Sequence, residues 1–428
     1  MGEHHESPRV VDVAVVGGGI AGLTAAAFAA RAGASVRLLD ARHEIGGRAR
    51  TAKTNGFSFN EGPHALYRAT TGHAALQELG IRPKGGNPPF DRTRFGLDGR
   101  QLRVPPAKAV SQVWGLFSRL GRDRHDPGLV RISAREWIDG RVADPVGRDL
   151  AAALVRVSTY SAALDGLSAD AASGQLHAAL RGVTYLHGGW AQIVAALTAV
   201  ATGAGATIGT PTKTTSVVPD GRRWTVTGAD GSTVDAGAVV LAAGGPDEAA
   251  QLTNESLTLS AAAAAARPVH AACFDLGLRR LTRPSVRFIL GLDEPTYASV
   301  HTPRARLTDD RRHHVVHLMR YEPSSDVGVS ELETLADRLQ PGWRNEELAR
   351  QIGRRRVVAF DRPRPGPGLR GRPTIEAAGL TGLFVAGDWV GPDDMLGGAA
   401  ITSGRASGLA AARHAGSLPR RQPQTAGA

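Results

Sequence analysis

Residues 10–22 read Val10-Val-Asp-Val-Ala-Val-Val-Gly-Gly-Gly-Ile-Ala-Gly22. The stretch up to Val16 is short, branched and apolar, which predicts a buried strand. Residues 20–32 are rich in alanine and leucine and predict a helix, and residues 35–39 predict a second strand. Strand, glycine turn, helix and strand make a βαβ unit, whose parallel strands need a right-handed crossover.

The glycine turn has the G-x-G-x-x-G pattern and lies directly between the strand and its helix. Such a turn lets the backbone approach a pyrophosphate, and the helix N-terminus favours its negative charge. At the end of the second strand, the Asp40 carboxylate can accept hydrogen bonds from a ribose, and Ala41 follows it. The sequence therefore predicts a dinucleotide site that includes Gly17, Gly18, Gly19, Ile20, Ala21, Gly22, Asp40 and Ala41.

Length and composition indicate a large folded protein. The chain has 428 residues, of which 42% are hydrophobic and 21% charged, so a sizeable core is expected and a small disulfide-linked module is excluded. Cys273 is the single cysteine, which fits a reducing cytoplasm. Because the net charge of +11 comes from scattered arginines and aromatic residues make up only 5%, nucleic acid is not an expected partner.

No membrane-spanning or secretory segment is expected. The first residues are polar, and the longest uncharged stretch, 188–212, is interrupted by Gly203, Gly205 and Pro211. Residues 105–120 allow two interpretations, because an apolar face with Lys108 and Arg119 nearby suits either packing in the protein or peripheral membrane contact. Packing is favoured, and a cytoplasmic location is expected.

The rest of the chain departs from the Rossmann alternation and then returns to it. Pro-rich loops and helices, including 105–120 and 149–164, are predicted between residues 67 and 184. A helix at 190–201 precedes a small meander at 214–218, 223–227 and 233–235 and a separate buried strand at 238–243. Later strands are expected at 269–276, 315–319 and 382–386, and a last helix at 398–412.

Several further motifs carry a family resemblance. Gly46-Gly47-Arg48 follows the acidic strand end, and Gly382-Leu-Phe-Val-Ala-Gly-Asp-Trp389 with Met395-Leu-Gly-Gly-Ala-Ala400 lies near the C-terminus. Residues 60–67 and 185–190 match two other segments of the same family. Together these motifs resemble flavoproteins of the amine oxidase, phytoene desaturase and protoporphyrinogen oxidase superfamily, and are most similar to phytoene desaturase-like dehydrogenases.

The resemblance implies FAD as cofactor. Asp388 would hold a ribityl hydroxyl, and the N-terminus of the last helix would face the flavin pyrimidine and stabilise negative charge there. Arg48 would pair with the pyrophosphate or support its loop. The cofactor residues implied in addition to the glycine turn and Asp40 are Gly47, Arg48, Gly62, Pro63, His64, Thr212, Gly387, Asp388, Leu396, Gly398 and Ala399.

The implied fold class is α/β, with a glutathione-reductase-like Rossmann FAD domain and an interleaved α+β substrate domain. The FAD domain would be discontinuous, comprising residues 10–66, 185–266 and 356–414. Residues 67–184 and 267–355 would form the substrate domain. Residues 1–9 and 415–428 are expected to be disordered tails.

The departures from the amine oxidases bear on the reaction. No lysine follows Lys213, and Met395 stands where an aromatic residue of the amine cage is expected. This favours an FAD-dependent oxidoreductase that transfers a hydride between flavin N5 and an apolar small molecule, in a desaturation or dehydrogenation. His64, Tyr67, Trp389 and Arg320 are the candidate catalytic residues.

Two alternatives stay open. One is oxidation of a secondary or hindered amine or an amino acid derivative, and the other is a protein whose FAD is structural or redox-neutral. No second fingerprint for NAD(P)H is visible, so oxygen, a quinone, another protein or a second substrate would complete the cycle. No metal is expected, because His313 and His317 lie in a strand-like stretch without a supporting carboxylate.

Overall fold

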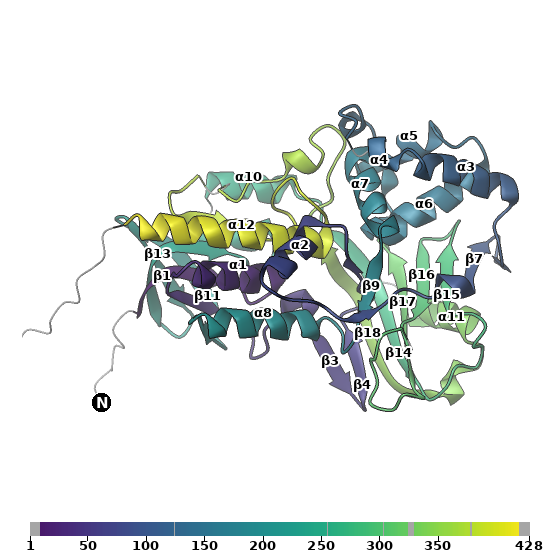
Figure 1. Cartoon of the computed structure of the whole chain (residues 1–428), viewed down its shortest axis with the longest axis horizontal. Coiled ribbons are helices and arrows are strands. Elements are labelled where there is room, and N and C mark those ends of the chain that lie inside the picture. Colours follow the sequence, from purple (N-terminus) through teal and green to yellow (C-terminus); the bar gives the residue numbers. More distant parts are fainter. Residues whose placement is uncertain are drawn as a thin grey trace, which may run out of the picture.

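A computed structural model describes residues 9–123, 125–254, 256–302, 304–323, 329–376 and 379–418. It has two parts (Figure 1). In one, long helices cover a sheet, and both ends of the described chain lie in this part, in β1 and in α12. In the other, a group of shorter helices lies above a second sheet. The first part carries the glycine turn, and the second supplies the cavity described below.

The first sheet is a mixed, seven-stranded Rossmann-type sheet with the order β10-β2-β1-β13-β12-β11, and β19 also pairs with β13. Strands β10, β2, β1, β13 and β19 are parallel, and β12 and β11 continue the sheet in antiparallel pairing. Their bounds are β1 Arg9–Val16, β2 Val36–Leu39, β10 Thr207–Gly209, β11 Thr214–Asp220, β12 Arg223–Gly228, β13 Thr233–Leu241 and β19 Leu383–Val385.

Helices α1 (Ile20–Arg31), α8 (Ala191–Gly203) and α12 (Leu396–Gly416) lie side by side along this sheet (Figure 1). Small residues let α12 approach α1 closely. A Cβ on Gly404 would lie 2.4 Å from the carbonyl oxygen of Ala21, and one on Gly408 would lie 2.3 Å from that of Ala25. The βαβ unit expected from the sequence is therefore present, with the last helix against the first.

The strand expected at 233–235 and the strand expected at 238–243 form one element, β13. The strand continues through Gly237 without a turn. At this position it lies close to its neighbours, since a Cβ there would be only 3.0 Å from the carbonyl oxygen of Asp12 and 3.1 Å from Cβ of Ala415. The glycine allows the strand to run on between β1 and α12. The prediction of two separate strands was wrong at this point.

The second sheet has the order β18-β14-β17-β16-β15-β7-β8. All neighbours are antiparallel except β15 and β7. Its strands are β7 Thr93–Leu97, β8 Arg100–Leu102, β14 Val269–Leu278, β15 Phe288–Gly291, β16 Thr296–Val300, β17 His314–Tyr321 and β18 Glu347–Ala359.

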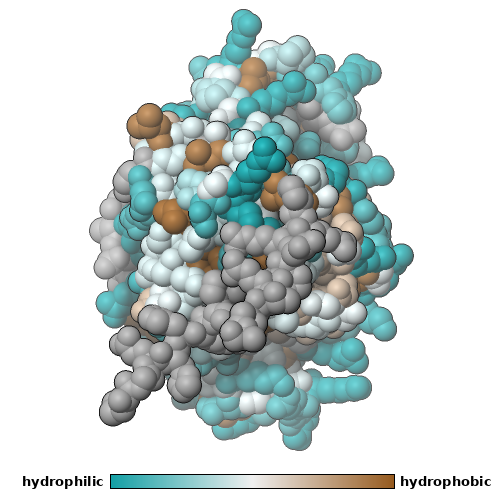
Figure 2. All heavy atoms as spheres, turned by 90° about the vertical axis from the view of Figure 1, so that its left-hand side faces the viewer, coloured by the Kyte–Doolittle hydropathy of each residue, from teal (hydrophilic) through white to brown (hydrophobic). Residues whose placement is uncertain are grey.

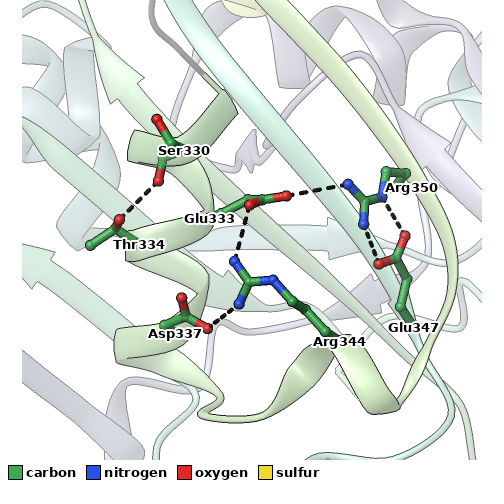
Figure 3. Close-up of polar contacts among 7 residues, drawn as sticks. All are labelled: Ser330, Glu333, Thr334, Asp337, Arg344, Glu347 and Arg350. Atoms are coloured by element: carbon green, nitrogen blue, oxygen red, sulfur yellow. Dashed lines mark hydrogen bonds and ion pairs between the residues drawn. The ribbon is translucent and has the colours of Figure 1, made fainter.

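One face of this sheet packs on α11 (Val329–Leu339) through an apolar cluster that includes Phe274, Leu335 and Trp343. Outside this cluster, Arg344 joins Glu333 and Asp337 at 3.0 and 2.7 Å, and Arg350 of β18 joins Glu333 at 3.3 Å (Figure 3). The ion pairs connect α11 to the edge strand of the sheet.

The other face is covered by the helices of residues 107–180. They are α3 Ala107–Phe117, α4 Leu120–Asp123, α5 Ala134–Asp139, α6 Pro145–Thr159 and α7 Ala169–Leu180. The helix expected at 149–164 begins earlier, because the Asp144 side chain caps it by accepting the N–H of Gly147 at 2.9 Å and Pro145 opens the first turn. It ends sooner because Tyr160 is left-handed, with φ of 61°.

Shorter elements complete the chain. Between β2 and β7 lie β3 Thr51–Thr54, β4 Phe57–Asn60, β5 Leu66–Tyr67, α2 Thr71–Glu78 and β6 Gly85–Gly86. β9 Val183–Leu186 pairs with β5 and β6, and α9 Pro246–Leu252 and α10 Leu257–Ala265 precede β14.

The strands of the first sheet lie within residues 9–39, 207–241 and 383–385, and those of the second within residues 93–102 and 269–359. β18 crosses residue 356, and α12 continues to Gly416, two residues past the boundary expected at 414. Residues 1–8 and 419–428 of the expected tails lie outside the described residues.

Within the described ranges, no helix has the length and apolarity that crossing a bilayer requires. On the face of the molecule shown in Figure 2, hydrophobic residues are scattered among hydrophilic ones.

Candidate functional site

The glycine turn packs tightly on one side and is open on the other. Gly17 has φ of +103°, and a Cβ there would lie 2.7 Å from the backbone of Ala242 at the end of β13. A Cβ on Gly22 would lie 1.9 Å from the carbonyl oxygen of Gly17, whereas one on Gly19 would meet nothing within 4 Å. The turn thus leaves space above Gly19 at the start of α1, where a pyrophosphate is expected.

Asp40 lies beside this turn. Its Oδ2 accepts the N–H of Gly18 at 2.6 Å, and its Oδ1 accepts that of Arg42 at 2.8 Å. Each carboxylate oxygen keeps a further lone pair for a ribose hydroxyl. Thr212 is next to Asp40, because its N–H donates to the Asp40 carbonyl at 2.7 Å, and Ala41 is exposed. The residues expected at the adenosine end are therefore brought together.

Arg48 connects the two ends of the chain. A Cβ on the preceding Gly47 would lie 3.2 Å from Cα of Gly19, so Arg48 starts directly above the glycine turn. Its guanidinium donates to both carboxylate oxygens of Asp388, at 2.8 and 3.0 Å, and to the carbonyl of Val358 at 2.7 Å. Asp388 also accepts the N–H of Phe360 at 3.2 Å. This bidentate pair places the closing motif at the opening one.

The start of α12 lies close to the start of α1. A Cβ on Gly397 would lie 3.7 Å from Cδ1 of Ile20 and 2.7 Å from the Trp190 ring. Leu396, Gly398 and Ala399 form the first turn of α12, and Ser403 of the next turn accepts the N–H of Gly387 at 3.0 Å. The Cα positions of Gly17–Gly22 and of Asp388 are thus held in one region.

The residues present fit FAD. Helices α1 and α12 both begin without a side-chain cap and without an acidic residue in the first turn. Uncapped N–H groups at two adjacent helix starts suit a pyrophosphate at one and an electron-rich flavin pyrimidine at the other. Arg48 and Asp40 add a cation and a ribose acceptor of the right kinds.

Gly62, Pro63 and His64 lead from the cofactor region toward the second sheet. Gly62 has φ of +93°, and a Cβ there would lie 2.8 Å from Sγ of the buried Cys273. Nδ1 of His64 is 2.9 Å from the Gly62 carbonyl oxygen, and the ring meets the edge of Trp190. Burial lowers the pKa of His64, so the ring is neutral at pH 7.

A cavity of about 590 Å³ lies next to His64, because the following residue, Ala65, forms part of its lining. It lies between α6 and α7 on one side and β7, β9, β15 and β16 on the other. Its buried end includes Tyr67, Tyr185 and Tyr297, and its exposed end includes Phe90 and Leu180. The lining residues are Ala65, Tyr67, Pro88, Phe90, Asp91, Thr93, Arg94, Phe95, Arg103, Leu154, Val157, Ser158, Tyr160, Leu176, Ala179, Leu180, Val183, Tyr185, Ser285, Phe288, Leu290 and Tyr297.

The closing motif lies near this region, because the His64 ring meets the edge of Trp190, and a Cβ on Gly397 would lie 2.7 Å from the Trp190 ring. Volumes of this size suit a small organic ligand. The cavity therefore adjoins the expected flavin-ring region.

A row of buried polar side chains leads away from the cavity, from Tyr185 and Tyr297 to His301 and His317. The hydroxyls of Tyr185 and Tyr297 are 2.9 Å apart, and that of Tyr297 is 3.4 Å from Nε2 of His301. The His301 ring stacks on Tyr185 at 3.6 Å and meets His317 at 4.2 Å, centroid to centroid. Burial first, then the nearby His317 and His64 rings, lower the pKa of His301 well below its usual value. The end of this row that faces the cavity, from Tyr185 to His301, is therefore uncharged at pH 7.

His317 belongs to this row of buried polar side chains, and its ring nitrogen faces Asp275 instead of His313. Its Nδ1 is 2.6 Å from Oδ1 of Asp275, and Gln351 donates to the other carboxylate oxygen at 3.1 Å. His313 instead stacks on Phe57. In the described part of the chain, no cluster of three His, Cys, Asp or Glu side chains has the arrangement of a metal site.

The four candidate catalytic residues lie in three places. Tyr67 lines the cavity, with its hydroxyl donating to the Ser158 carbonyl at 2.8 Å, and His64 lies next to the lining residue Ala65. Trp389 is buried in the cluster behind the Rossmann sheet. Arg320 is on the α11 face of β17, 3.6 Å from Glu331. Neither Trp389 nor Arg320 lines the cavity, because strand alternation and the turn after Asp388 direct them elsewhere.

Sequence reasoning missed Arg94, Arg103, Tyr160, Phe288 and Tyr297. They come from separate strands and loops, so spacing along the chain carries no sign of their proximity. Tyr185 was part of a recognised segment without a role of its own.

The profile of a NAD(P)-binding Rossmann-like domain matches residues 15–79. Over 92% of this chain and 98% of the other, the fold is similar to that of an oxidoreductase from Methanosarcina mazei, with a TM-score of 0.72 and 18% identity. It is also similar to cyclohexylamine oxidase from Brevibacterium oxydans, over 96% and 100% of the chains, with a TM-score of 0.67 and 16% identity.

The chain thus has the fold of these two proteins, with a Rossmann-like domain at residues 15–79. The fold class predicted from the sequence is thus confirmed. By their names, both of these proteins are oxidoreductases, which agrees with the predicted enzyme class.

Curated relatives match over short segments. A carotenoid 3,4-desaturase from Haloarcula japonica is 54% identical over 52 residues, which is 12% of this chain and 10% of the relative. A limonene dehydrogenase polypeptide from Castellaniella defragrans is 43% identical over 75 residues, or 17% and 13%. L-amino acid oxidase Lm29 from Lachesis muta is 30% identical over 133 residues, or 31% and 23%. The chain thus spans less than a quarter of the length of these relatives.

Proposed function

We propose that this protein is an FAD-dependent oxidoreductase that transfers a hydride between an apolar small molecule and the flavin. The observation that carries the proposal is the apolar cavity whose lining includes Ala65, the residue next to His64. Its buried end is made of side chains such as Leu154, Leu176, Phe288 and Leu290. A carotenoid desaturase and a limonene dehydrogenase among the relatives act, by their names, on apolar molecules, which agrees with this lining.

When bound, FAD supplies a two-electron acceptor or donor at N5. The chain's own part is to hold the cofactor and to orient the substrate. Gly17–Gly22, Asp40 and Arg48 would hold the adenosine and pyrophosphate, and Asp388 and the first turn of α12 would hold the ribityl chain and ring. The apolar walls would exclude water and fix the reacting carbon, which hydride transfer requires more than an acid or a base.

The experiment is to purify the chain, identify its flavin and add candidate substrates without oxygen. We expect bound FAD, and loss of the flavin absorbance near 450 nm when an unsaturated or saturated hydrocarbon-like substrate is oxidised. Asp40→Ala should weaken FAD binding, and Asp220→Asn, on the exposed β11–β12 turn, should not. A purified chain that neither contains nor binds flavin would refute the proposal.

The same preparation separates the alternatives. Peroxide production that depends on a secondary amine or an amino acid derivative would favour amine oxidation, to which the L-amino acid oxidase relative points by its name. A flavin that stays oxidised during turnover would favour a redox-neutral role.

Peripheral membrane contact is a separate proposal that rests on α3. Val113 and Leu116 are buried against the helical layer, whereas Val104, Val110 and Trp114 are 71%, 40% and 72% exposed. Exposed apolar residues beside Lys108 would suit an anionic bilayer surface. Flotation with vesicles of anionic lipid tests this, and Trp114→Ser should reduce any co-flotation; absence of wild-type co-flotation would refute it.

A further inference from the structure

The exposed end of the cavity differs chemically from its buried end. Arg94, just inside β7, and Arg103, one residue past β8, both line it. β7 and β8 pair with Phe95 opposite Leu102, so the two arginines continue the same antiparallel register and lie on the same side of the hairpin. The hairpin thus presents two cations to the cavity.

This arrangement is unfavourable without a counter-charge. Like charges opposite one another in an antiparallel pair destabilise the pair. Burial, followed by the nearby Arg103 and Arg283, lowers the pKa of Arg94, which reports the same repulsion. Within the described residues, neither Arg94 nor Arg103 forms an ion pair, and the hydrogen bond of the Arg94 guanidinium goes to the carbonyl of Thr93 at 2.9 Å.

The only carboxylate among the lining residues is Asp91, and it is engaged elsewhere. Its Oδ1 is 3.2 Å from Arg304, and its Oδ2 is 3.7 Å from Arg92. Other cations near this end are Arg283, 3.0 Å from Gln101, and Arg287. The electrostatic potential at the exposed end is therefore positive, and the walls behind it are apolar.

We propose that the substrate of this cavity is an amphiphile whose single anionic head group, a carboxylate or a phosphate, binds between Arg94 and Arg103 while its apolar body fills the buried end. Guanidinium groups suit both head groups because they can donate two parallel hydrogen bonds to each. The bound anion would supply the counter-charge that the hairpin lacks. This inference deepens the proposed function and rests on it for the statement that the cavity holds the substrate.

The test measures binding and requires no turnover. The probes are dodecanoate, dodecyl phosphate, dodecan-1-ol and dodecyltrimethylammonium, titrated into the FAD-loaded full-length protein in a calorimeter. The ionic probes are kept below their micellar concentrations and the alcohol below its solubility limit. We expect both anions to bind at least about tenfold more tightly than the alcohol, and the ammonium probe to bind most weakly. The tighter of the two anions identifies the preferred head group.

The variant is Arg94→Gln combined with Arg103→Gln, and the matched control is Arg312→Gln. Arg312 is 88% exposed, pairs with Asp310 and does not line the cavity. The double variant should lose the preference for anions and keep its affinity for dodecan-1-ol within about twofold, whereas the control should bind like the wild type. Raising NaCl should weaken binding of the anions and leave that of the alcohol unchanged.

Melting temperatures give a second readout. The double variant should melt at the same temperature as the wild type or higher, because a repulsive pair is removed. Dodecanoate should raise the melting temperature of the wild type and not that of the double variant.

Equal affinity for alcohol and anions, or anion binding that survives both substitutions, would overturn the head-group proposal. If the protein loads FAD and binds no anion, this proposal fails while the proposed function stands. If it binds the anions through the two arginines and never takes up FAD, the head-group site stands, whereas the proposed function fails and with it the statement that the bound amphiphile is the substrate.

Discussion

At the scale of single residues, Asp388 combines a structural role with an expected role in cofactor binding. In the structure it pairs with Arg48 and accepts the N–H of Phe360, and it was expected from the sequence to hold a ribityl hydroxyl. Its side chain is almost completely buried and is shared between two ends of the chain. Cofactor binding and stability should therefore depend on it together.

Replacing Asp388 by Ala should lower the free energy of unfolding by about 1–3 kcal/mol, because a buried backbone N–H and a guanidinium lose their acceptor. It should also weaken FAD binding about tenfold or more, because the ribityl hydroxyl expected at this position would lose a charged hydrogen-bond acceptor. Urea unfolding and flavin titration measure the two effects, with Asp220→Ala as control. If neither quantity changes, the connection between the two motifs has no energetic role.

Buried histidines make stability depend on pH. The pKa values of His64 and His301 are lowered in the folded state, chiefly by burial, and that of His314 is lowered to about 4. Between these values and the ordinary pKa near 6.5, the unfolded chain binds more protons than the folded one. The free energy of unfolding should therefore fall as the pH is lowered from 7 toward 5.

His301→Phe should make this decline shallower, because phenylalanine can keep the stack on Tyr185 and binds no proton. One histidine contributes at most about 1.4 kcal/mol per pH unit. Denaturant unfolding at pH 7, 6 and 5 measures the slope, and His125→Gln, at an exposed position, should leave it unchanged. An unaltered slope in His301→Phe would show that the ring does not stay neutral in the fold.

At the scale of elements, the outer face of the second sheet is held by both apolar packing and charge. Leu335 and Trp343 bury apolar surface, and Glu333 joins two arginines from separate segments (Figure 3). Exposed ion pairs contribute little singly, so the apolar cluster should dominate.

Glu333→Gln should lower the melting temperature by only about 1–2 °C, and less in 1 M NaCl, because salt screens exposed charges. Leu335→Ala should cost far more, since its side chain is 4% exposed and its loss leaves a cavity. Calorimetry on both variants compares them. A larger loss for Glu333→Gln would mean that charge, and not apolar contact, attaches α11.

At the scale of the whole molecule, FAD would bridge elements that are distant along the chain. α1, β2, β19 and α12 would contact one ligand, so binding should stabilise the fold as a unit.

Removing FAD should therefore lower the melting temperature in a single shifted transition, and adding it back at about one hundred times its Kd should restore about 2.7 kcal/mol. Differential scanning calorimetry of both forms measures this. Equal melting temperatures would contradict binding of FAD across these elements.

The sequence by itself determined the βαβ unit and the pairing of Gly17–Gly22 with Asp40, because these depend on neighbours along the chain. It also determined the closing motif, whose residues are contiguous. Strand β13 and the bounds of α6 departed from the prediction, because close packing at Gly237 and capping by Asp144 decided them.

Only the tertiary structure decided the cavity and its charges. Arg94 and Arg103 meet because β7 and β8 form a hairpin, and Tyr185 meets His301 because β9 runs beside the second sheet. Arg320 lies outside the cavity because its side chain is on the face of the sheet that packs on α11. Contacts between distant segments arise from sheet order and helix packing, and no local pattern of residues records them.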